Sequence, residues 1–416
     1  MAQSSDIDLN PSKTKRSLAL IFVIMLMDII GITLLSPVAP YIVRNYSNEA
    51  LMVTMITILY AAGQFIAAPL IGKLGDRYGR RPVLLVSIFG QGLGFLFFGI
   101  GGSLWMLFLG RIIGGITGGN LSTASAYIAD VSKPEERSKN FTLIGTAWSL
   151  GLILGPAAGG LLGQISLNAP AYAAALLSFI NVLLGIFMLP ESLPKERRDT
   201  THMQASDFNP LVAIAGMARK PGLGWFLIVT CLFNFAFNGI NSTSTLFVIQ
   251  KFSAQTWHVS ALLMLAGASI TFTNFILVPR IVPRFGEKLV ASCSLFGQAI
   301  FNIVIFFIPI FWPIFILNML VSGTSSFTFP TLTTLAIERV PPREIGLLMG
   351  VTTGLGSLMN IFGPLWAGAV YDHVVVGAPY WMGALILVVA GLMLFRPITP
   401  SQEPALETES GEPEIS

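Results

Sequence analysis

Twelve long apolar runs limit what this chain can fold into. Each run is about 20 residues long or longer, the length that a helix needs to cross a hydrocarbon core of about 30 Å. Only 11% of the residues are charged and 53% are hydrophobic, whereas about a quarter of the residues in a soluble domain are charged. We therefore predict an all-α membrane protein with twelve transmembrane helices. Their approximate ranges are 18–42, 51–71, 83–101, 104–129, 141–163, 170–189, 223–248, 258–279, 288–309, 311–336, 346–370 and 378–396.

The positive charges predict how the chain is oriented. Lys and Arg accumulate in the cytoplasmic loops of membrane proteins. If the amino terminus is inside, 21 of the 24 Lys and Arg residues fall in inner segments, the outer loops hold only Arg44 and Lys251, and Arg111 lies within a run. We therefore expect a multi-pass protein of the cytoplasmic (inner) membrane, surrounded by the lipid bilayer, with both termini in the cytoplasm.

Pairs of landmarks recur at nearly one spacing, which indicates a duplicated unit. Arg77-Tyr78-Gly79 returns as Arg284-Phe285-Gly286 207 residues later, and Gly155-Pro156 returns as Gly363-Pro364 208 residues later. The first pair lies between runs two and three and between runs eight and nine, and the second lies in runs five and eleven. We predict two pseudo-symmetric bundles of six helices each.

The expected domain boundaries follow from the runs and from the polar stretches between them. The segment after residue 190 is charged and then turns apolar at 210–218, which predicts a short helix on the membrane surface. The Glu-rich stretch after Pro400 is too polar to pack, so we expect it to be disordered. The predicted parts are a cytoplasmic N-terminal tail (1–17), an N-terminal six-helix bundle (18–189), a central cytoplasmic loop (190–222), a C-terminal six-helix bundle (223–397) and a disordered acidic tail (398–416).

A short charged turn, Gly72 to Leu84, lies between the second and third runs. It combines one carboxylate with arginines and glycines at fixed positions. These are Gly72, Leu74, Asp76, Arg77, Gly79, Arg80 and Arg81. In residue type and spacing the turn closely resembles the loop 2-3 signature of the major facilitator superfamily of secondary transporters. The resemblance implies a twelve-helix transporter that works by alternating access to a site between two bundles.

The same resemblance implies a gating latch at this turn. In the family the loop carboxylate lies at the amino end of span eleven, which places Asp76 near Ile345 to Leu348, where the helix dipole favours negative charge. The arginine of the motif pairs with the acid that ends span four, which pairs Arg80 with Asp130. Such a latch holds the cytoplasmic side shut and releases when the halves rock. The alternative, plain positive-inside anchoring, explains the arginines but not Asp76 or the glycines.

Asp28 in the first run and Arg111 in the fourth are the two charged residues away from the ends of the runs. A charge at the bilayer centre costs about 2.5 to 3.5 kcal/mol on insertion scales, so each side chain should face the bundle interior or a wet cavity. Their depths agree to within roughly one helical turn, so they could pair directly or through water. The functional interpretation is that Asp28 exchanges a proton while Arg111 influences its charge state. The structural alternative is a permanent ion pair that joins two helices.

Glycines mark the fourth and fifth runs. Arg111 begins Arg-x-x-x-Gly115-x-x-x-Gly119, which resembles the family's span-four motif, and glycines at this spacing let helices approach closely. The fifth run holds Gly151-x-x-x-Gly155-Pro156-x-x-Gly159-Gly160, which resembles the signature of the antiporter branch. The proline bends the helix, and the glycines give a smooth face on which another helix can rock. The match favours export over uptake.

The likeness narrows to one group within that branch. Asp28-x-x-Gly31 with Pro37-x-x-Pro40 resembles the first span of tetracycline/proton and related drug/proton antiporters, and the resemblance covers about residues 15 to 396. It departs where tetracycline exporters carry acidic residues in spans three and nine, because Gly94 and Gln298 stand there. The departure argues against metal–tetracycline as the substrate and leaves Asp28 as the intramembrane acid for coupling.

Uncharged polar and aromatic residues within the runs are the candidates for substrate binding. They are Asn234, Phe237, Asn238 and Asn241 in the seventh run, Tyr60 and Gln64 in the second, and Asn360 in the eleventh. The three asparagines of the seventh run share one helical stripe. We expect a roomy cavity for amphipathic, weakly charged molecules. Alternatively, these polar groups only hydrogen-bond neighbouring helices.

Together these features predict a proton-coupled exporter of drug-like or amphipathic small molecules, functional as a monomer, with the substrate and protons as its partners. One alternative is a facilitator or uptake carrier for a metabolite such as a sugar, and another is a non-transporting membrane sensor or scaffold. No nucleophile-base set, cofactor motif or metal-ligand spacing is visible, so we expect no enzyme, cofactor or metal site. No basic patch with interleaved aromatics occurs, so nucleic acid is not an expected partner.

Overall fold

The computed structural model describes residues 11–133, 136–198, 223–341 and 345–395, and all the secondary structure in them is helical. The first part of the chain forms α1 (Pro11–Leu34), α2 (Ala39–Arg44), α3 (Ala50–Tyr78), α4 (Arg80–Ile100), α5 (Leu104–Thr117), α6 (Asn120–Val131), α7 (Arg137–Ile165), α8 (Ala169–Met188) and the short 3-10 helix η2 (Lys195–Arg197). The second part forms α10 (Leu223–Phe252), α11 (Thr256–Phe272), the π-helical turn η4 (Thr273–Leu277), α12 (Val278–Phe285), α13 (Glu287–Phe307), α14 (Pro313–Ile337), α15 (Ile345–His373) and α16 (Ala378–Phe395).

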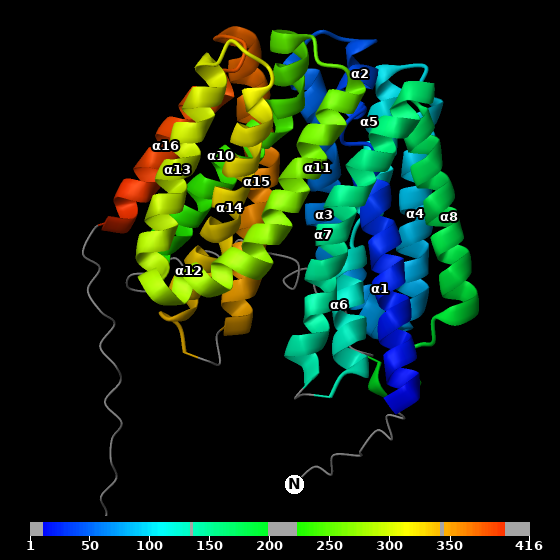
Figure 1. Cartoon of the computed structure of the whole chain (residues 1–416). Helices are drawn as coiled ribbons and strands as arrows, with labels where there is room; N and C mark the ends of the chain where they lie inside the picture. Colours follow the sequence, from blue (N-terminus) through cyan, green and yellow to red (C-terminus); the bar gives the residue numbers. More distant parts are fainter. Residues whose placement is uncertain (1–10, 134–135, 199–222, 342–344, 396–416) are drawn as a thin grey trace, which may run out of the picture.

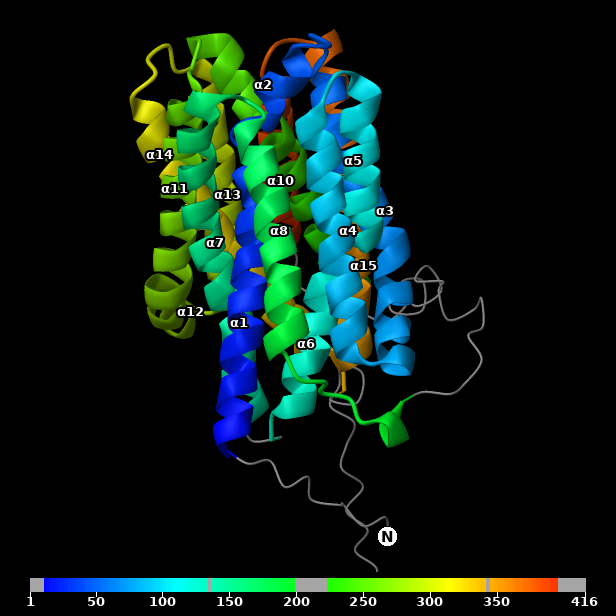
Figure 2. The same cartoon turned by 90° about the vertical axis from the view of Figure 1, so that its right-hand side faces the viewer.

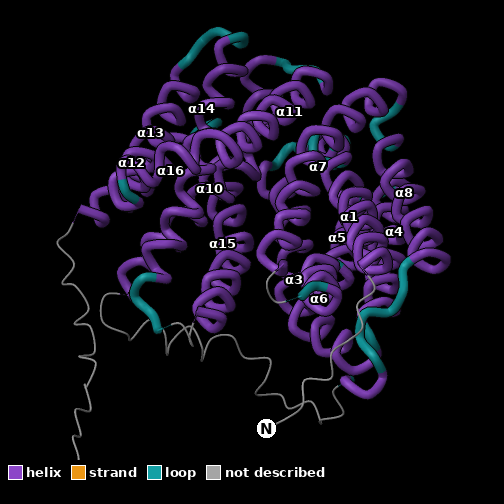
Figure 3. The backbone as a smooth tube through the Cα atoms, turned by 60° about the horizontal axis from the view of Figure 1, so that its bottom comes forward, coloured by secondary structure: helices purple, strands orange, loops and turns teal. Residues whose placement is uncertain are grey.

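These helices stand in two groups side by side. Figure 1 shows the helices from α1 to α8 on its right and those from α10 to α16 on its left, and Figure 3 shows the same two groups from another side. Figure 2 shows α1, α4 and α8 running nearly parallel within the first group. We call the groups the first half and the second half. The end of the molecule at which α1 begins, the bottom in Figure 1, is the N-terminal face, and the opposite end, at which α2 lies, is the far face.

The described helices have the character of membrane spans. Eleven segments are long and apolar enough to cross a membrane. The predicted span 311–336 is not among them, because α14 is rich in Ser and Thr, although it packs lengthwise against α11 and α13. Leu161, Ile165 and Phe187 are 68, 79 and 81% exposed on the molecular surface, where lipid rather than water suits them. The predicted all-α membrane fold is confirmed, and α14 is the span that composition alone does not mark.

Two predicted spans are interrupted and a third contains a π-helical turn, each next to a helix-breaking residue. Run one divides between α1 and α2 near Pro37, run four divides at Gly118–Gly119 between α5 and α6, and run eight passes through η4 just before Pro279. Proline lacks the N–H that the helix ladder needs and glycine weakens it. Helix α1 already begins within the expected tail 1–17. The predicted surface helix at 210–218 and acidic tail at 398–416 lie outside the described residues.

The landmarks of the predicted duplication sit at equivalent turns. Gly79 ends α3 with φ of +106°, and Gly286 ends α12 with φ of +79°. Residues other than glycine rarely adopt such positive φ values, because their Cβ atom clashes with the backbone. Each turn therefore requires its glycine. The two halves therefore leave the N-terminal face by the same kind of turn.

The buried apolar side chains show where the halves meet. One core cluster lies wholly in the first half, with Ile24, Ile88 and Tyr127, and another lies wholly in the second half. A third cluster contains residues of both halves, including Val38 and Phe247, and all its residues lie toward the far face. The shared core therefore holds the halves together at the far face.

Polar contacts between the halves also lie at the far face. The carboxylate of Asp372, at the end of α15, accepts hydrogen bonds from the backbone N–H groups of Ala50 (2.8 Å) and Leu51 (2.9 Å) at the start of α3. The hydroxyl of Tyr41 donates to the carbonyl of Ala254 across the same face.

Toward the N-terminal face the helices that face the other half have free space beside their glycines. A Cβ atom added at any of four glycines would meet no atom of the described residues within 4 Å. They are Gly72 in α3, Gly145 in α7, and Gly350 and Gly356 in α15. In Figure 1 the two groups of ribbons diverge toward this end. The halves are thus joined at the far face and apart at the N-terminal face.

Candidate functional site

A cavity of about 380 Å³ lies in the first half of the protein. Its walls come from α1, α3, α4, α6 and α7, and Asn360 of α15 adds a group from the second half. Its one carboxylate is Asp28 on α1, whose side chain is buried. Most of the other lining side chains are apolar, so the cavity brings a single acid into apolar surroundings. We call it the Asp28 cavity.

Asp28 is held by an amide. Asn120 Nδ2 donates to both carboxylate oxygens, at 3.0 Å to Oδ1 and 3.1 Å to Oδ2, and lies 3.3 Å from Oε1 of Gln91 on α4. Asn120 is the first residue of α6, directly after the Gly118–Gly119 break. The interruption of span four therefore begins a new helix at the residue that contacts the acid.

This polar cluster of Asp28, Gln91 and Asn120 is not fully paired. Gln91 Nε2 and Asn120 Oδ1 are buried and have no hydrogen-bond partner among the described residues. Buried polar groups are normally paired, and those that are not call for an explanation such as bound water or a functional role. The cluster therefore has unused hydrogen-bonding capacity beside the carboxylate.

Arg111 does not pair with Asp28. Its guanidinium carbon lies 5.3 Å from the ring centre of Phe98 and 5.7 Å from that of Tyr60, and its Nε has no partner among the described residues. None of the ion pairs in the described part of the chain joins the two charges. The expectation of a direct pair is wrong for this conformation, because equal depth does not make two side chains point toward each other. Tyr60 contacts Arg111 and also lines the Asp28 cavity, so it is their shared neighbour.

The predicted substrate-binding residues divide into three sets. Tyr60, Gln64 and Asn360 line the Asp28 cavity, whereas Phe237 and Asn241 line a second cavity in the other half. Asn234 and Asn238 line neither cavity; each donates its amide to a backbone carbonyl four residues earlier in α10, at 2.9 and 2.8 Å. The predicted asparagine stripe is therefore split, and of its three asparagines only Asn241 makes no side-chain hydrogen bond to the described residues.

The glycines of the predicted antiporter motif lie where α7 touches other helices. A Cβ atom at Gly155 would lie 1.8 Å from Thr33 Oγ1, and one at Gly159 would lie 2.2 Å from the carbonyl oxygen of Leu34, both on α1. Gly151 packs in the same way on Ile29. Gly160 faces Ser260 on α11, so the motif also reaches the second half. The motif gives α7 a smooth face against the helix that carries Asp28.

The charged turn at the N-terminal face forms a connected cluster. Arg80 contacts the carboxylates of Asp76 (2.5 Å) and Asp130 (3.3 Å), so the structure contains the Arg80–Asp130 contact implied by the resemblance. Arg81 donates to the carbonyls of Gly185 and Ile186 at the end of α8. Each arginine thus ties the turn to another helix of the same half.

The other predicted residues of the latch are placed less closely. Arg77 lies against the ring of Tyr78, its own neighbour in sequence. The predicted contact between Asp76 and the start of α15 falls at the edge of the undescribed segment 342–344, and it stays a prediction. Gly72 faces open space in this conformation.

Two features of the site are not predicted from the sequence. A search for charged residues in the spans does not find Asn120 and Gln91, because both are uncharged. The position of Asn120 directly after two glycines is nevertheless a signal that the sequence contains. Glu191 accepts a hydrogen bond from the backbone N–H of Arg80 (2.8 Å), and one of its carboxylate oxygens lies 2.4 Å from where a Cβ atom of Gly79 would be. Glu191 follows α8, far along the sequence from the turn, so spacing does not reveal it.

Two groups of membrane-spanning helices that share a core at one face and stand apart at the other, with a buried acid in a cavity, define a polytopic secondary transporter. The chain belongs to the major facilitator superfamily, whose family description matches residues 21–358 and 259–414. The family consists of transporters and not of enzymes. The predicted family is confirmed.

Individual relatives agree with this assignment. The chain is 32% identical to the class C tetracycline resistance protein of Escherichia coli over 386 residues, which cover 92% of this chain and 96% of that protein. It is 26% identical to multidrug resistance protein 2 of Bacillus subtilis (strain 168), with 89% of this chain and 93% of that protein covered. Among solved structures, the human organic anion transporter MFSD10 (TETRAN) has the same fold, with a TM-score of 0.69, 24% identity, and 92% and 99% of the two chains covered. The chain is thus a transporter related to tetracycline and multidrug efflux proteins.

Proposed function

We propose that this transporter is a proton-coupled exporter of drug-like, amphipathic small molecules, and that Asp28 is the group that exchanges the proton. In this scheme the N-terminal face is cytoplasmic, as the excess of Lys and Arg on that side indicates. The protein then works from the cytoplasmic (inner) membrane as a monomer. The substrate and protons are its partners.

The observation that carries this proposal is the environment of Asp28. The carboxylate is buried in a cavity within the membrane-spanning helices, and it accepts hydrogen bonds from a neutral amide. A buried carboxylate paired with a cation would be fixed in its charged form. Asp28 has no cation within ion-pair distance among the described residues, so nothing of that kind locks it in one protonation state. Intramembrane acids in such settings mark proton pathways.

The arrangement of α1 and α7 supports a mechanical link between this acid and the motion of the halves. Thr33, five residues beyond Asp28 on α1, donates a hydrogen bond to the carbonyl of Gly151 in the glycine motif (2.9 Å). Gly160 of the same motif lies against Ser260 of the second half. A change at Asp28 that shifts α1 would therefore act on the helix that touches the other half.

The conformation supports loading from the cytoplasm. The halves are joined at the far face and apart at the N-terminal face, the state in which a site between them faces the side of the chain's first residues. A cycle of export needs the opposite state as well, in which the N-terminal face closes. The Arg80 cluster, with Asp76 and Asp130, lies at that face, and in this proposal it takes part in closure.

The names of the relatives support export in particular. Several proteins of similar length are named tetracycline resistance proteins, and one is a multidrug resistance protein. A transporter can give resistance by moving the compound out of the cell. A facilitator that is not coupled to protons does not need a buried acid that changes its charge.

Reconstituted transport tests the proposal. Compounds are first chosen by a growth-inhibition panel in an efflux-deficient host that expresses the native chain. Vesicles that contain the purified protein are then given a pH gradient, and accumulation of a chosen compound is followed in the native chain and in Asp28→Asn. We expect uphill accumulation by the native chain and only equilibration by the variant, with counterflow retained. Accumulation that ignores the gradient, or that survives Asp28→Asn, would contradict proton coupling at Asp28.

A further inference from the structure

A second cavity, of about 360 Å³, lies toward the far face between α1 and α7 of the first half and the helices of the second half. This volume falls within the range of small-molecule sites. On α1, Ile32 lines the Asp28 cavity and the next residue, Thr33, lines the second cavity. The two cavities are therefore neighbours along the same helix. We call the second one the amide cavity.

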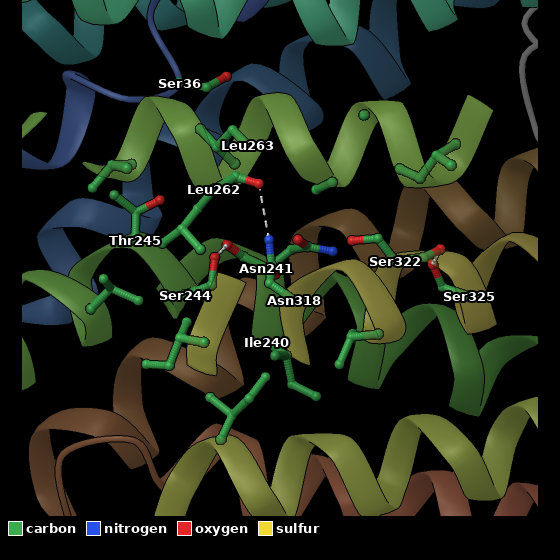
Figure 4. A pocket seen from close by; sticks show the side chains of 18 of the residues that line it. Ser36, Ile240, Asn241, Ser244, Thr245, Leu262, Leu263, Asn318, Ser322 and Ser325 are labelled. Atoms are coloured by element: carbon green, nitrogen blue, oxygen red, sulfur yellow. Dashed lines mark hydrogen bonds between the residues drawn. The ribbon is translucent and has the colours of Figure 1, made fainter. Parts of the chain in front are cut away.

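The residues that line the amide cavity include none that carries a charge at neutral pH. None of its lining residues is Asp, Glu, Lys, Arg or His, and its polar groups are amides and hydroxyls. They include Asn241, Gln298, Asn302, Asn318, Ser322 and Ser325. Figure 4 shows Asn241, Asn318 and Ser322 among the aliphatic side chains that line the same cavity. Moving an ion from water into such surroundings is costly, because no opposite charge compensates it.

Two amide oxygens at this cavity have no hydrogen-bond donor among the described residues. Asn302 is 2% exposed, and its Oδ1 has no hydrogen-bond partner among the described residues. Gln298, one helical turn earlier on α13, donates its amide to Thr328 Oγ1 (3.0 Å), which also bonds Ser294, and its Oε1 has no donor in the described part of the chain. Asn318 donates to the carbonyl of Leu262 (3.1 Å), as the dashed line in Figure 4 shows, so its amide N–H is also in use.

These acceptors define what the cavity would bind. A buried carbonyl oxygen without a donor is costly, and a ligand N–H or O–H group would pair with it. A ligand that supplies such donors and an apolar body, without a net charge, fits both the lining and the lack of a counter-charge. An ammonium ion or a metal chelate supplies donors or charge but loses its hydration without compensation.

We propose that the amide cavity is the substrate site, that it takes uncharged amphipathic molecules with hydroxyl or amide N–H groups, and that Asn302 and Gln298 set this selectivity. The inference rests on the proposed transport function and names its substrate class. Proton and substrate would then occupy separate cavities on α1. Asn241, whose side chain bonds to none of the described residues, adds an adaptable polar group from α10.

Equilibrium binding to the purified full-length protein in detergent tests whether the amide cavity is the substrate site. The measurement does not depend on transport. The probe is chloramphenicol, an uncharged aromatic compound with one amide and two hydroxyl groups, and the comparator is tetracycline with Mg²⁺, a charged chelate. We expect the native chain to prefer chloramphenicol. Asn302→Leu and Gln298→Glu should each weaken its binding about tenfold or more, since each removes or charges an acceptor in a buried setting. The matched control is Asn238→Leu, which changes an amide that lines neither cavity and should leave affinity within about twofold.

Each outcome of this binding experiment either supports or overturns the amide cavity as the substrate site. Asn241→Leu, at an exposed position, provides a second variant if Asn302→Leu does not fold, and it should also weaken binding. Lack of chloramphenicol binding by the native chain, or tighter binding of the magnesium chelate, would overturn the proposal. Binding that is lost in Asp28→Asn but unchanged in the amide-cavity variants would place the ligand in the other cavity and also overturn it. Binding that behaves as expected while gradient-driven transport fails would instead count against the proposed coupling alone.

Discussion

The two carboxylate oxygens of Asp28 share one donor, the side-chain nitrogen of Asn120, at 3.0 and 3.1 Å. The pair joins α1 to α6 across the break in span four. A neutral donor stabilises the charged carboxylate by less than a cation does, so proton uptake has a smaller interaction to overcome. We therefore expect Asn120 to control how readily Asp28 takes up the proton in the proposed coupling.

Removing this donor should shift the pH dependence of transport. In Asn120→Leu the charged carboxylate loses hydrogen bonds worth about 1.5 to 3 kcal/mol each, and 1.36 kcal/mol corresponds to about one pH unit. The protonated form of Asp28 becomes more favourable relative to the charged form. The midpoint of the transport–pH profile should therefore move to higher pH by about one unit or more. The matched control is Asn181→Leu, because Asn181 is also buried in the first half but donates to the carbonyl of Ile24. An equal shift in both variants would show that the effect is not specific to Asp28.

Substitution of Arg111 tests whether this residue acts in transport or only stabilises the fold. Its guanidinium lies near two aromatic rings and has no anionic partner in the described part of the chain. Cation–π contacts of this kind contribute about 0.5 to 2 kcal/mol. Arg111→Met should therefore fold with nearly native thermal stability but show weaker gradient-driven transport. Phe98→Leu keeps the cation and removes one ring, so transport should persist. Should Arg111→Met fail to fold while Phe98→Leu folds, the cation has a structural role.

The glycines of α7 should differ sharply in what they tolerate. A Cβ atom at Gly159 would meet the Leu34 backbone carbonyl, which cannot rotate away, whereas one at Gly145 in the same helix would meet nothing. We expect Gly159→Ala to destabilise the protein by about 1 to 3 kcal/mol through overpacking. Gly145→Ala should be neutral or stabilising by up to about 1 kcal/mol. Thermal unfolding of the purified variants measures both, and equal losses would argue against close packing of α1 on α7.

The contact of Asp372 with the start of α3 should hold the far face shut. The carboxylate caps two backbone N–H groups of the other half, and such caps contribute about 0.5 to 2 kcal/mol. Asp372→Ala should therefore shift the equilibrium toward a far-face-open state by about 2- to 30-fold. Glu49→Gln is the control, because Glu49 precedes α3 but makes no side-chain cap.

Distances between spin labels at Asn48→Cys and His373→Cys, with Cys231 and Cys293 changed to Ser, would report the opening of the far face. A longer distance in Asp372→Ala and an unchanged distance in Glu49→Gln are expected. If neither distance distribution changes, the cap does not hold this face.

Much of the fold can be predicted from the sequence, and part of the site cannot. Run length and charge predict helical spans because a bilayer leaves few alternatives. They also identify Asp28, since an acid in an apolar run is conspicuous. Depth along a helix does not give direction around it, so Asp28 and Arg111 do not form the direct pair that their depths allow, while a pair through water stays a prediction.

The asparagines of α10 show a second limit. Their spacing places them on one stripe, but Asn234 and Asn238 bond to carbonyls of their own helix. Only coordinates separate an amide used by its own backbone from one that faces a cavity, as Asn241 does. The contact of Asn120 with Asp28 is not predicted for a related reason. An uncharged side chain does not indicate its partner until the packing of α1 on α6 is known.

Proton release on substrate binding tests the central claim most directly. Purified protein in weakly buffered detergent solution is mixed with a compound selected in the resistance panel, and the change in pH is recorded. If substrate and proton compete through Asp28, linkage requires that binding releases protons. We predict release of up to one proton per bound substrate by the native chain, and none by Asp28→Asn under conditions in which it still binds the compound. Equal release by both proteins, or none by either, would contradict the assignment of Asp28 as the coupling group.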